Sequence, residues 1–479
     1  METFEPVIGL EVHCQLLTES KIFSASSARF EPRPNHAIDT YCIGLPGVLP
    51  KLNRAVVLLG LKAGLALECR IRQQSIFARK HYFYPDLPKG YQISQYDRPL
   101  AEHGRLEVDT DDGDTRVVSI VRIHLEEDAG KNVHDEASSF TKLDYNRSGV
   151  PLAEIVTGPD LRSAGEAARA FRTLHGILVA IGVCDGNMQE GSLRADANVS
   201  IRPKGREAFG TRTEIKNLNS FRFLEQAVES EILRQARLVI EGGSVTQETR
   251  LFDSVKKVTR TMRSKEEAHD YRYFPDPDLP PLDIPESWIE EARSSLPELP
   301  RAAARRYREL GLGAEVASLF SEDRRVSAFF DQAIGHWPLG AVPIANLVRG
   351  EILRELKDSA VETPIRIRPS DAAELSRAKE EGRISSTQLK KIFVAMWHES
   401  KSLESTLAEE GSQVADSSTL EPVVAELVSA FPKERVEYQK GKTKLISFFI
   451  GQAMKRTGGK ASPEVLRDLL IRHLGGPTS

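Results

Sequence analysis

The segment RIHLE at residues 122–126 alternates polar and apolar residues without interruption. The same pattern recurs in EVH at 11–13, RADAN at 194–198 and RTEIK at 212–216. Because a β-strand turns successive side chains to opposite faces, each segment places its charged residues on one face. A solvated face explains any one segment best. If all four strands share a sheet, their Asp, Glu, His, Arg and Asn side chains would form a floor suited to a phosphorylated, metal-bound substrate.

The size and composition of the chain indicate a multidomain globular protein. Its 479 residues are too many for one core, and about three domains are expected. A net charge of −4 gives no overall signal for nucleic acid. The N-terminus lacks the basic start and apolar core of a signal peptide, and the longest apolar run, 55–67, is too short to cross a bilayer. We therefore expect a cytoplasmic protein with no membrane partner.

Charge is distributed unevenly near the C-terminus. Residues 400–430 contain one Lys against six Asp or Glu, whereas residues 433–473 contain ten Lys or Arg against four Asp or Glu. A basic module that follows an acidic, helix-poor stretch suggests a tail that meets a polyanion. A solvated helical surface explains the charges equally well.

The pattern of the chain changes at residues 274–281, where a Pro-dense run excludes regular structure and indicates a boundary. Before it, strand-like segments alternate with turns rich in Gly and Pro. After it, apolar spacing predicts helices over residues 301–310, 326–334 and 344–356. Three more helices are predicted to begin at Ser370-Asp371, Ser385-Ser386 and Ser462-Pro463.

Common nucleotide-binding and hydrolase motifs are absent from the sequence. Gly441-Lys442-Thr443 resembles the end of a phosphate-binding loop, but Val436 stands where that loop needs Gly and no strand precedes it. The patterns GxGxxG, HExxH and GxSxG do not occur. The four cysteines show no C-x-x-C spacing, so they indicate neither a zinc site nor a disulfide framework.

Longer motifs match one family in order along the chain. They are VIGLEVH at 7–13, RKHYFYPDLPKGYQISQY at 79–96, IHLEEDAGK at 123–131, DYNR at 144–147, EGSLRAD at 190–196, EIKNLNSF at 214–221, DYRYFP at 270–275, and IAN at 344–346 with GE at 350–351. On these motifs the chain resembles GatB of the aspartyl/glutamyl-tRNA(Asn/Gln) amidotransferase complex GatCAB. The resemblance covers nearly the whole chain.

The resemblance implies an α+β protein with three parts. A mixed α/β cradle domain with a largely antiparallel sheet would span residues 1–293. An all-α helical domain would span residues 294–405, and a small helical YqeY-like tail that binds tRNA would span residues 406–479.

The reaction that the resemblance implies is an ATP-dependent amidation of misacylated Glu-tRNA(Gln), Asp-tRNA(Asn) or both. A carboxylate is a poor electrophile, so ATP would first convert it to an acyl phosphate, which ammonia would then attack. No glutaminase arrangement is evident in the sequence. The family therefore implies that the amidase partner of the complex, GatA, supplies the ammonia and that the small partner, GatC, braces a heterotrimer.

The resemblance also assigns roles to individual residues. The catalytic residues are expected to be Glu11, His13, Glu126, Glu127, Asp196 and Glu214. All of these except Asp196 are also expected to bind Mg²⁺, since phosphoryl transfer uses a divalent metal and oxygen ligands suit Mg²⁺. Contacts to ATP or the substrate are expected from Arg79, Lys80, Tyr82, Lys216, Asn217 and Asn219.

Simpler explanations exist for several of these residues. His13 alone could be a strand histidine satisfied by a neighbour, but its place two residues after Glu11 favours the site. A surface salt bridge suits Arg79 better than Lys216, which shares a strand face with Glu214. Adjacent Glu126 and Glu127 would face opposite sides of a regular strand, so both reach one site only if the strand ends or bulges.

One departure from the family concerns zinc. Family members often bind zinc through two Cys-containing pairs, and the matching positions here are Ser24, Ser26, Asp39 and Cys42. One thiol cannot form a tetrahedral thiolate site. We therefore expect no zinc, and a loop held by packing and hydrogen bonds.

Two other functions remain open from the sequence. The chain could be a non-catalytic scaffold that binds tRNA, or a carboxylate-amine ligase acting on a small molecule. The intact set of acidic residues with His13 argues against the scaffold. The basic tail argues against a small-molecule substrate.

Overall fold

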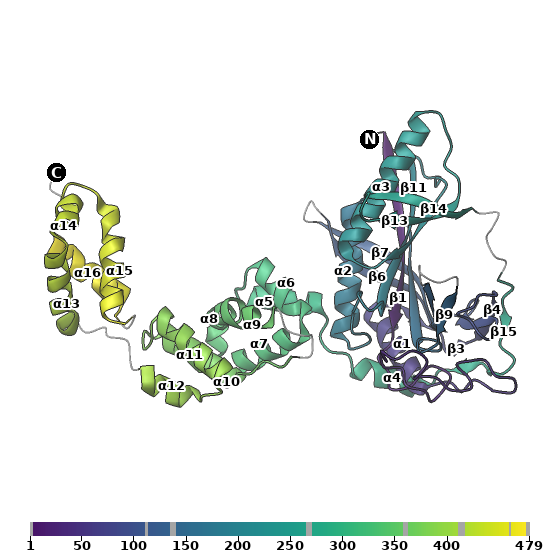
Figure 1. Ribbon diagram of the computed structural model, residues 1–479, viewed down its shortest axis with the longest axis horizontal. Coiled ribbons are helices and arrows are strands. Elements are labelled where there is room, and N and C mark those ends of the chain that lie inside the picture. Colours follow the sequence, from purple (N-terminus) through teal and green to yellow (C-terminus); the bar gives the residue numbers. More distant parts are fainter. Residues whose placement is uncertain are drawn as a thin grey trace. The chain divides into compact units, whose positions relative to one another are not determined.

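The structure, a computed structural model, describes residues 3–110, 114–134, 140–264, 271–357, 363–410, 417–458 and 461–475. The chain divides into two units, Met1–Pro300 and Arg301–Ser479 (Figure 1). Asp270, which begins one matched motif, and Asp416 and Lys460, which belong to the charge counts, lie outside the described residues. In the described ranges, no helix has both the length and the apolar character that a membrane span requires.

A nine-stranded sheet with the order β14-β13-β12-β11-β1-β10-β7-β6-β2 forms the frame of the first unit. Every neighbouring pair is antiparallel except β12 with β13, which confirms the predicted, largely antiparallel sheet. The strands are β1 (Phe4–Gln15), β2 (Arg70–Ile71), β6 (Ala101–Asp109), β7 (Thr115–Glu127), β10 (Pro151–Thr157), β11 (Leu193–Pro203), β12 (Thr213–Leu218), β13 (Glu248–Asp253) and β14 (Val258–Ser264).

The four alternating segments all belong to this sheet. They lie in β1, β7 and β11 and at the start of β12, where Arg212 immediately precedes the strand. β10, which is not one of the four alternating segments, lies between β1 and β7. The expected common polar floor is therefore present, with one additional strand inserted in it.

Helices cover the apolar face of the sheet. They are α1 (Arg54–Ala66), α2 (Ala164–Ala180) and α3 (Phe221–Ile240), and α4 (Glu286–Ser294) packs against α1. Ser163 and Ser220 begin α2 and α3 as N-caps, since their hydroxyls accept the N–H groups of Glu166 and Phe223.

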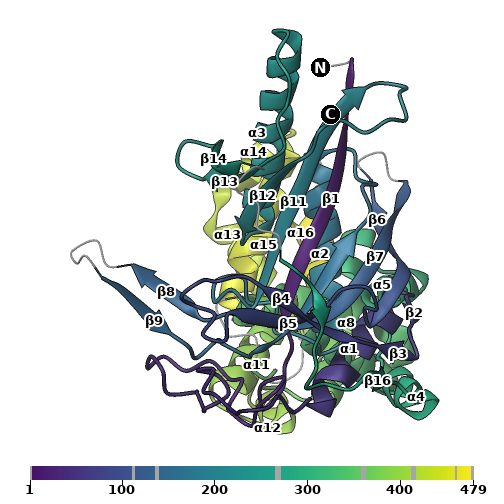
Figure 2. The same ribbon diagram turned by 90° about the vertical axis from the view of Figure 1, so that its right-hand side faces the viewer.

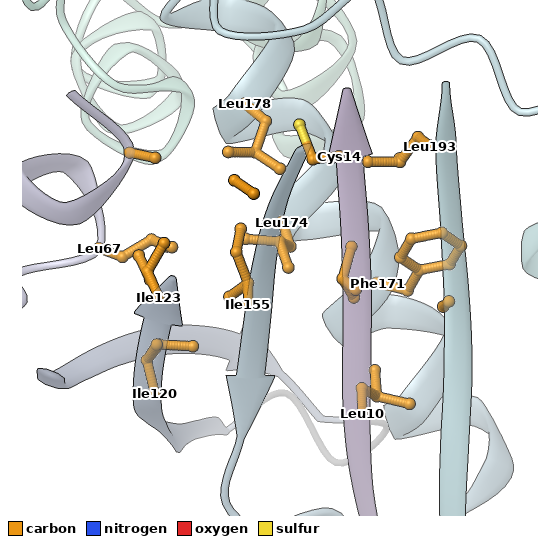
Figure 3. Packing of buried hydrophobic residues seen from close by; sticks show 14 of the residues in the cluster. Leu10, Cys14, Leu67, Ile120, Ile123, Ile155, Phe171, Leu174, Leu178 and Leu193 are labelled. Atoms are coloured by element: carbon orange, nitrogen blue, oxygen red, sulfur yellow. The ribbon is translucent and has the colours of Figure 1, made fainter. Parts of the chain in front are cut away.

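Buried apolar side chains join these helices to the sheet. Figure 3 shows Leu10, Ile123 and Ile155 of three strands packed toward Phe171 and Leu174 of α2. Burying each side chain of this size contributes roughly 1.5–3 kcal/mol. The strands are thereby held in register, and their other face is left for polar residues.

A smaller sheet with the order β15-β4-β5 lies against the polar face near β7 (Figure 2). Its strands are β4 (Phe77–His81), β5 (Tyr91–Gln95) and β15 (Phe274–Pro275). The prediction that residues 274–281 lack regular structure was wrong at the first two residues. Pro275 is tolerated because β15 is an edge strand. Two further pairs join β3 (Gln74–Ser75) to β16 (Leu282–Asp283) and β8 (Lys131–His134) to β9 (Thr141–Asp144).

The described part of the second unit consists of helices. They are α5 (Pro300–Glu309), α6 (Ala314–Glu322), α7 (Arg324–His336), α8 (Ala341–Leu347), α9 (Leu353–Leu356), α10 (Pro369–Glu380), α11 (Ser386–His398), α12 (Leu403–Glu410), α13 (Ser417–Ala430), α14 (Pro432–Gln439), α15 (Ile446–Arg456) and α16 (Pro463–Leu474). Their buried apolar residues form two clusters, one between Ala303 and Leu403 and the other between Leu420 and Leu474. The sequence-based boundaries after residues 293 and 405 fall inside α4 and α12 and stay a prediction.

Several predicted helices are confirmed with small changes. Ser385 is the N-cap of α11 and forms a capping box with Gln388. The helix expected to begin at Ser370 begins instead at Pro369, whose fixed φ suits the first helical position. The helix expected over 344–356 contains a π-helical turn, Val348–Ile352.

The prediction of a helix-poor acidic stretch was wrong. Helices α12 and α13 cover most of residues 400–430. Leu420, Val424 and Leu427 recur at helical spacing and are fully buried. This apolar stripe stabilises α13, and the acidic residues Glu421 and Glu426 lie on its exposed side.

Candidate active site

Strand register arranges the polar residues of the sheet in neighbouring rows. Glu11 on β1 lies opposite Asp196 on β11. In the next row, Glu154 on β10 lies between His13 and His124. Residues from sequence positions far apart therefore meet on one face.

Two histidines and three carboxylates form the centre of this face. His13 Nε2 lies 3.5 Å from Glu11 Oε1 and 3.4 Å from Glu154 Oε2. His124 Nε2 lies 3.4 Å from both Glu126 Oε2 and Glu154 Oε2. Glu154 therefore contacts both imidazoles and connects the two ends of the cluster.

Lys216 bridges the carboxylates on the β11–β12 side. Its Nζ lies 3.1 Å from Asp196 Oδ2 and 3.1 Å from Glu214 Oε1. Thr249 Oγ1 donates to the other Glu214 oxygen at 2.9 Å. The backbone N–H of Asn217, a residue with φ of +61°, donates to Asp196 Oδ1 at 2.9 Å. These contacts fix the orientation of both carboxylates.

A pocket of about 590 Å³ lies over the polar face. Its floor includes Glu11, Arg122, His124, Glu154, Arg212, Glu214 and Lys216, and its other wall includes Lys80, Tyr96, Tyr271 and Tyr273. The rings of Tyr96 and Tyr273 stack with their centroids 4.2 Å apart. The pocket thus combines carboxylates, cations and aromatic rings.

The charges in the pocket shift one another's pKa values. Burial lowers the pKa of His124, but the carboxylates of Glu154 and Glu126 outweigh it and raise that pKa to about 9. Burial raises the pKa of Glu11, and the nearby Glu154 carboxylate raises it further. Burial also acts to lower the pKa of Lys80, yet Glu126 and Glu154 keep it above its ordinary value. Protonated His124 and Lys80 therefore balance part of the negative charge of the carboxylates.

The donor set fits a divalent cation. Two groups of side chains bring their ligand atoms within 4.8 Å of one another: Glu11, His13 and Asp196, and His13, Glu126 and Glu154. The Nδ1 atoms of His13 and His124 are buried and have no hydrogen-bond partner in the described part of the chain. Carboxylate oxygens and imidazole nitrogens suit Mg²⁺ or Mn²⁺.

Comparison with known proteins identifies the family. A family model described as the GatB/GatE catalytic domain matches residues 6–290, which contain the whole pocket, and one described as the GatB domain matches residues 328–474. The chain belongs to the GatB family. It is similar to proteins named as the B subunit of aspartyl/glutamyl-tRNA(Asn/Gln) amidotransferase.

Three of these GatB relatives illustrate the extent of the match. The Syntrophotalea carbinolica protein is 49% identical over 99% of both chains. The Myxococcus xanthus protein is 48% identical over 98% of this chain and 99% of its own. The Geobacter sulfurreducens protein is 49% identical over 99% of this chain and all of its own. The similarity is therefore not confined to the catalytic region.

Glu127 does not join the cluster of this GatB chain, contrary to expectation. β7 pairs regularly with β10 through Glu126 and Glu127, without a bulge, so the two side chains face opposite sides. Lys89 Nζ donates to Glu127 Oε2 at 2.7 Å, and the Ile93 N–H donates to Oε1 at 2.9 Å. The geometry assigns Glu127 to a buried ion pair that attaches the 79–96 segment to β7.

The residues expected to contact ATP or substrate fall into two sets. Lys80 and Lys216 line the pocket, whereas Arg79, Tyr82, Asn217 and Asn219 are not among its lining residues.

The second set has other surroundings. Arg79 donates to Asp276 at 2.8 Å and to Asp278 at 2.7 Å, which agrees with the salt-bridge alternative. Tyr82 meets Tyr271 edge-on, with ring centroids 5.9 Å apart. Asn219 is exposed between β12 and α3.

Glu154 was not predicted from the sequence, and no individual role was predicted for His124 or Arg122. Glu154 is the single charged residue of PLAEIVT at 151–157, which otherwise reads as an apolar strand. A single carboxylate in an otherwise apolar strand could therefore have indicated a functional residue, because burying a charge without a partner is unfavourable. His124 and Arg122 belong to RIHLE, where alternation already indicated their face.

The loop at the expected zinc positions surrounds a buried ammonium group. Lys21 is fully buried, and its Nζ donates to the Ala37 carbonyl at 2.8 Å and lies 3.3 Å from Cys42 Sγ. Asp39 Oδ1 accepts the Cys42 N–H at 3.0 Å, and Ser24 Oγ lies 3.8 Å from Cys42 Sγ. Hydrogen bonds and packing therefore hold this loop, as expected.

Proposed function

We propose that this chain uses ATP and Mg²⁺ to phosphorylate the side-chain carboxylate of Glu or Asp on a misacylated tRNA, and then converts the acyl phosphate to an amide. One observation carries the proposal: a histidine–carboxylate cluster forms the floor of a pocket that also presents Lys80 and Lys216. The relatives, whose names describe one component of an aspartyl/glutamyl-tRNA(Asn/Gln) amidotransferase, support the same reaction.

Glu11, His13, Glu126, Glu154 and Asp196 are the residues that would hold the metal. A bound divalent ion would neutralise phosphate charge during phosphoryl transfer. Glu127 is left out of this set because its carboxylate is paired with Lys89.

Lys80 and Lys216 would bind phosphate oxygens as point charges. Lys216 is held between Asp196 and Glu214, so its ammonium group is in place before the substrate arrives. Arg122 also lines the pocket, and its guanidinium lies 4.0 Å from Glu154. A positioned cation stabilises negative charge without rearranging during the reaction.

Attack by ammonia releases a proton that a nearby group must accept. The phosphate that leaves the acyl phosphate is anionic and can accept this proton, so Glu11 remains available to hold the metal. The Tyr96–Tyr273 pair at the rim offers an apolar surface for a base of ATP or of the tRNA terminus.

Partner proteins complete the proposed reaction. The amidase GatA would supply ammonia, and the small protein GatC would brace the heterotrimer. The basic C-terminal tail would bind misacylated tRNA by its backbone charge. The reaction belongs to translation, and we place it in the cytoplasm.

Reconstitution with GatA and GatC tests this function. We expect misacylated tRNA to stimulate ADP release and to yield the amidated product. Glu11→Gln should lower single-turnover phosphorylation by roughly 100-fold or more, the scale of losing one preorganised electrostatic contact. Glu241→Gln, at an exposed position after α3, is the control and should retain activity. ADP release that is independent of misacylated tRNA, or an active Glu11→Gln variant, would refute the proposal.

A further inference from the structure

Lys216 lines the pocket and is held in place by residues of its own strand and of both neighbouring strands. We infer that Thr249 and Asn217 are positioning residues, which fix the Lys216 ammonium group so that it binds an anionic oxygen of the ligand. The inference rests on the proposed function, in which that oxygen belongs to a phosphate group. The strands involved, β11, β12 and β13, are consecutive neighbours in the sheet (Figure 2).

The first positioning feature is a bulge in β12. The pairing with β11 shifts by one residue here, so Lys216 and Asn217 together lie opposite the single residue Asp196. Ile215 and Leu218, on either side of this pair, are both buried, whereas the side chain of Asn217 is exposed. The extra residue therefore turns away from the core, as in other β-bulges that re-aim a side chain.

The bulge brings two donors to one carboxylate. The backbone N–H of Asn217 donates to Asp196 Oδ1 at 2.9 Å, and Lys216 Nζ donates to Asp196 Oδ2 at 3.1 Å. Asn217 has a φ of +61°, in the left-handed region, which Asn tolerates better than most residues. Both oxygens of Asp196 are thus occupied, and the ammonium group has a fixed partner on its β11 side.

The second positioning feature is the hydroxyl group of Thr249 on β13. Thr249 lies opposite Glu214 in the parallel register of β12 and β13. Its Oγ1 donates to Glu214 Oε2 at 2.9 Å, and the other carboxylate oxygen, Oε1, lies 3.1 Å from Lys216 Nζ. Thr249 therefore orients the carboxylate that holds the ammonium group on its second side.

These contacts leave the ammonium group able to bind a ligand. An ammonium group has three N–H donors, so it can contact both carboxylates and still donate to a third acceptor. Within the described ranges, the structure gives Lys216 no partner other than Asp196 and Glu214. Its side chain is 28% exposed where it lines the pocket. A donor is therefore available on the pocket side.

Positioning matters because a lysine side chain is flexible. Its ammonium group is a point charge on a four-carbon stem, and a ligand that must order this stem on binding loses affinity. The two carboxylates order the stem in advance. If the contacts only joined β12 to β13, their loss would lower stability without changing the affinity for an anion.

Binding of inorganic tripolyphosphate to the full-length chain tests the inference. This probe has the phosphate oxygens of ATP without the nucleoside, and calorimetry at a fixed Mg²⁺ concentration measures its affinity. Thr249→Val keeps the shape of the side chain but removes the hydroxyl group. It should weaken binding by roughly 2- to 10-fold, the scale of ordering one flexible side chain. Thr249→Ser restores a hydroxyl group and should recover most of the affinity.

A double-mutant cycle shows whether Thr249 acts through Lys216. Lys216→Met removes the ammonium group, and in that background Thr249→Val should have no further effect. If Lys216→Met binds too weakly to measure, Lys216→Arg supplies the background, and the effect of Thr249→Val should then be smaller than in the wild type. An undiminished effect in the background used would overturn the inference, and so would a wild type that does not bind the probe.

Thr261→Val is the matched control for Thr249→Val. Thr261 lies on the neighbouring strand β14, and its Oγ1 accepts from Arg250 Nη1 at 3.1 Å, so the same substitution removes a contact that does not lead to Lys216. Its affinity for tripolyphosphate should equal that of the wild type. Equal affinities of Thr249→Val and Thr261→Val would overturn the inference.

Two substitutions of Asn217 test the bulge. A β-branched residue is strained at a positive φ, whereas Gly adopts it freely. Asn217→Val should therefore weaken binding as Thr249→Val does, and Asn217→Gly should bind more tightly than Asn217→Val. The reverse order would overturn the role of the bulge. Circular dichroism checks folding, and Asn217→Ala replaces Asn217→Val if that variant does not fold.

The binding measurements need neither tRNA nor phosphoryl transfer. If the variants bind as expected but the chain does not phosphorylate misacylated tRNA, the proposed function alone is refuted. If the chain is active but Thr249→Val binds the probe as tightly as the wild type, this inference alone is refuted.

Discussion

Glu126 and Glu127 show that a shift of one position along a strand changes the surroundings and the role of a side chain. They are adjacent and both are nearly fully buried, at 3% and 1% exposure. Glu126 faces the histidines, whereas Glu127 pairs with Lys89 on the other side. Two identical side chains therefore have different chemistry because the strand pleat turns them apart.

At the residue scale, we expect Glu127→Gln to affect stability more than the chemical step. It leaves the Lys89 ammonium buried without its partner, and breaking a buried ion pair typically costs about 3–5 kcal/mol. Urea unfolding of the variant should show this loss. The double variant Glu127→Gln/Lys89→Met should recover part of it, because it removes both charges. A Glu127→Gln variant of unchanged stability would contradict the ion-pair assignment.

The Lys21 loop leads to a prediction about metal content. Ser24, Ser26 and Asp39 supply no thiolates, and the Lys21 ammonium lies next to Cys42. A cation close to the one thiol opposes binding of Zn²⁺ by simple repulsion. Elemental analysis of the purified protein should therefore find far less than one zinc per chain. Stoichiometric zinc that survives dialysis against a chelator would disprove this account.

At the scale of elements, a buried polar network attaches α3 to the edge of the sheet. Glu231 is fully buried on α3. It accepts hydrogen bonds from Thr213 at 2.7 Å, Thr259 at 2.8 Å and Gln235 at 2.9 Å, and it forms an ion pair with Arg234. The network therefore connects the helix to β12 and β14, which lie on the side of the sheet that supplies Glu214 and Thr249.

This network predicts a particular dependence of stability on pH. Burial raises the pKa of Glu231, but hydrogen bonds from Arg234, Gln235 and Thr213 outweigh it and lower the pKa below 4.5. A carboxyl group whose pKa is lower in the folded state stabilises the protein above its unfolded pKa. That stabilisation is lost as the pH falls through the lower pKa that Glu231 has in the folded state.

We therefore expect Glu231→Gln to be less stable than the wild type at pH 7, by roughly 1.5–3 kcal/mol for hydrogen bonds to a charged group. The difference should begin to shrink below about pH 4.5, because the unfolded wild-type chain takes up a proton there, and it should be lost as the pH falls through the lower pKa of the folded state. Thermal unfolding from pH 3 to 8 measures both effects. A difference that grows on acidification would show that the sign is wrong.

At the scale of the whole molecule, the described residues form three hydrophobic clusters. The first belongs to the sheet and its helices, and the second and third belong to the helical unit. The third cluster runs from Leu420 to Leu474 and coincides with the basic segment of residues 433–473. The C-terminal module therefore has its own core.

Because of that separate core, we expect deletion from Ser412 onward, a position outside the described residues, to leave the rest folded. The truncated protein should bind tRNA more weakly, and each lost phosphate contact should reduce the salt dependence by roughly one counterion. Saturating tRNA should restore most single-turnover phosphorylation. Unchanged affinity and salt slope would mean that the tail does not contact tRNA.

The sequence by itself determined which face of each strand is polar, because alternation follows from the local geometry of an extended backbone. It predicted that residues 11–13, 122–126, 194–198 and 212–216 would form one polar floor if their strands shared a sheet, and its motifs matched the family. It also placed helices such as α11, whose cap at Ser385 is a local signal.

Only the tertiary structure decided which side chains meet. Insertion of β10 between β1 and β7 brought Glu154 to His13 and His124, and regular pairing of β7 turned Glu127 away. Arg79 likewise forms an ion pair with Asp276, which lies nearly two hundred residues later in the chain. Strand order and ion pairing join residues that are distant in sequence, and a local pattern of polar and apolar residues contains no information about such partners.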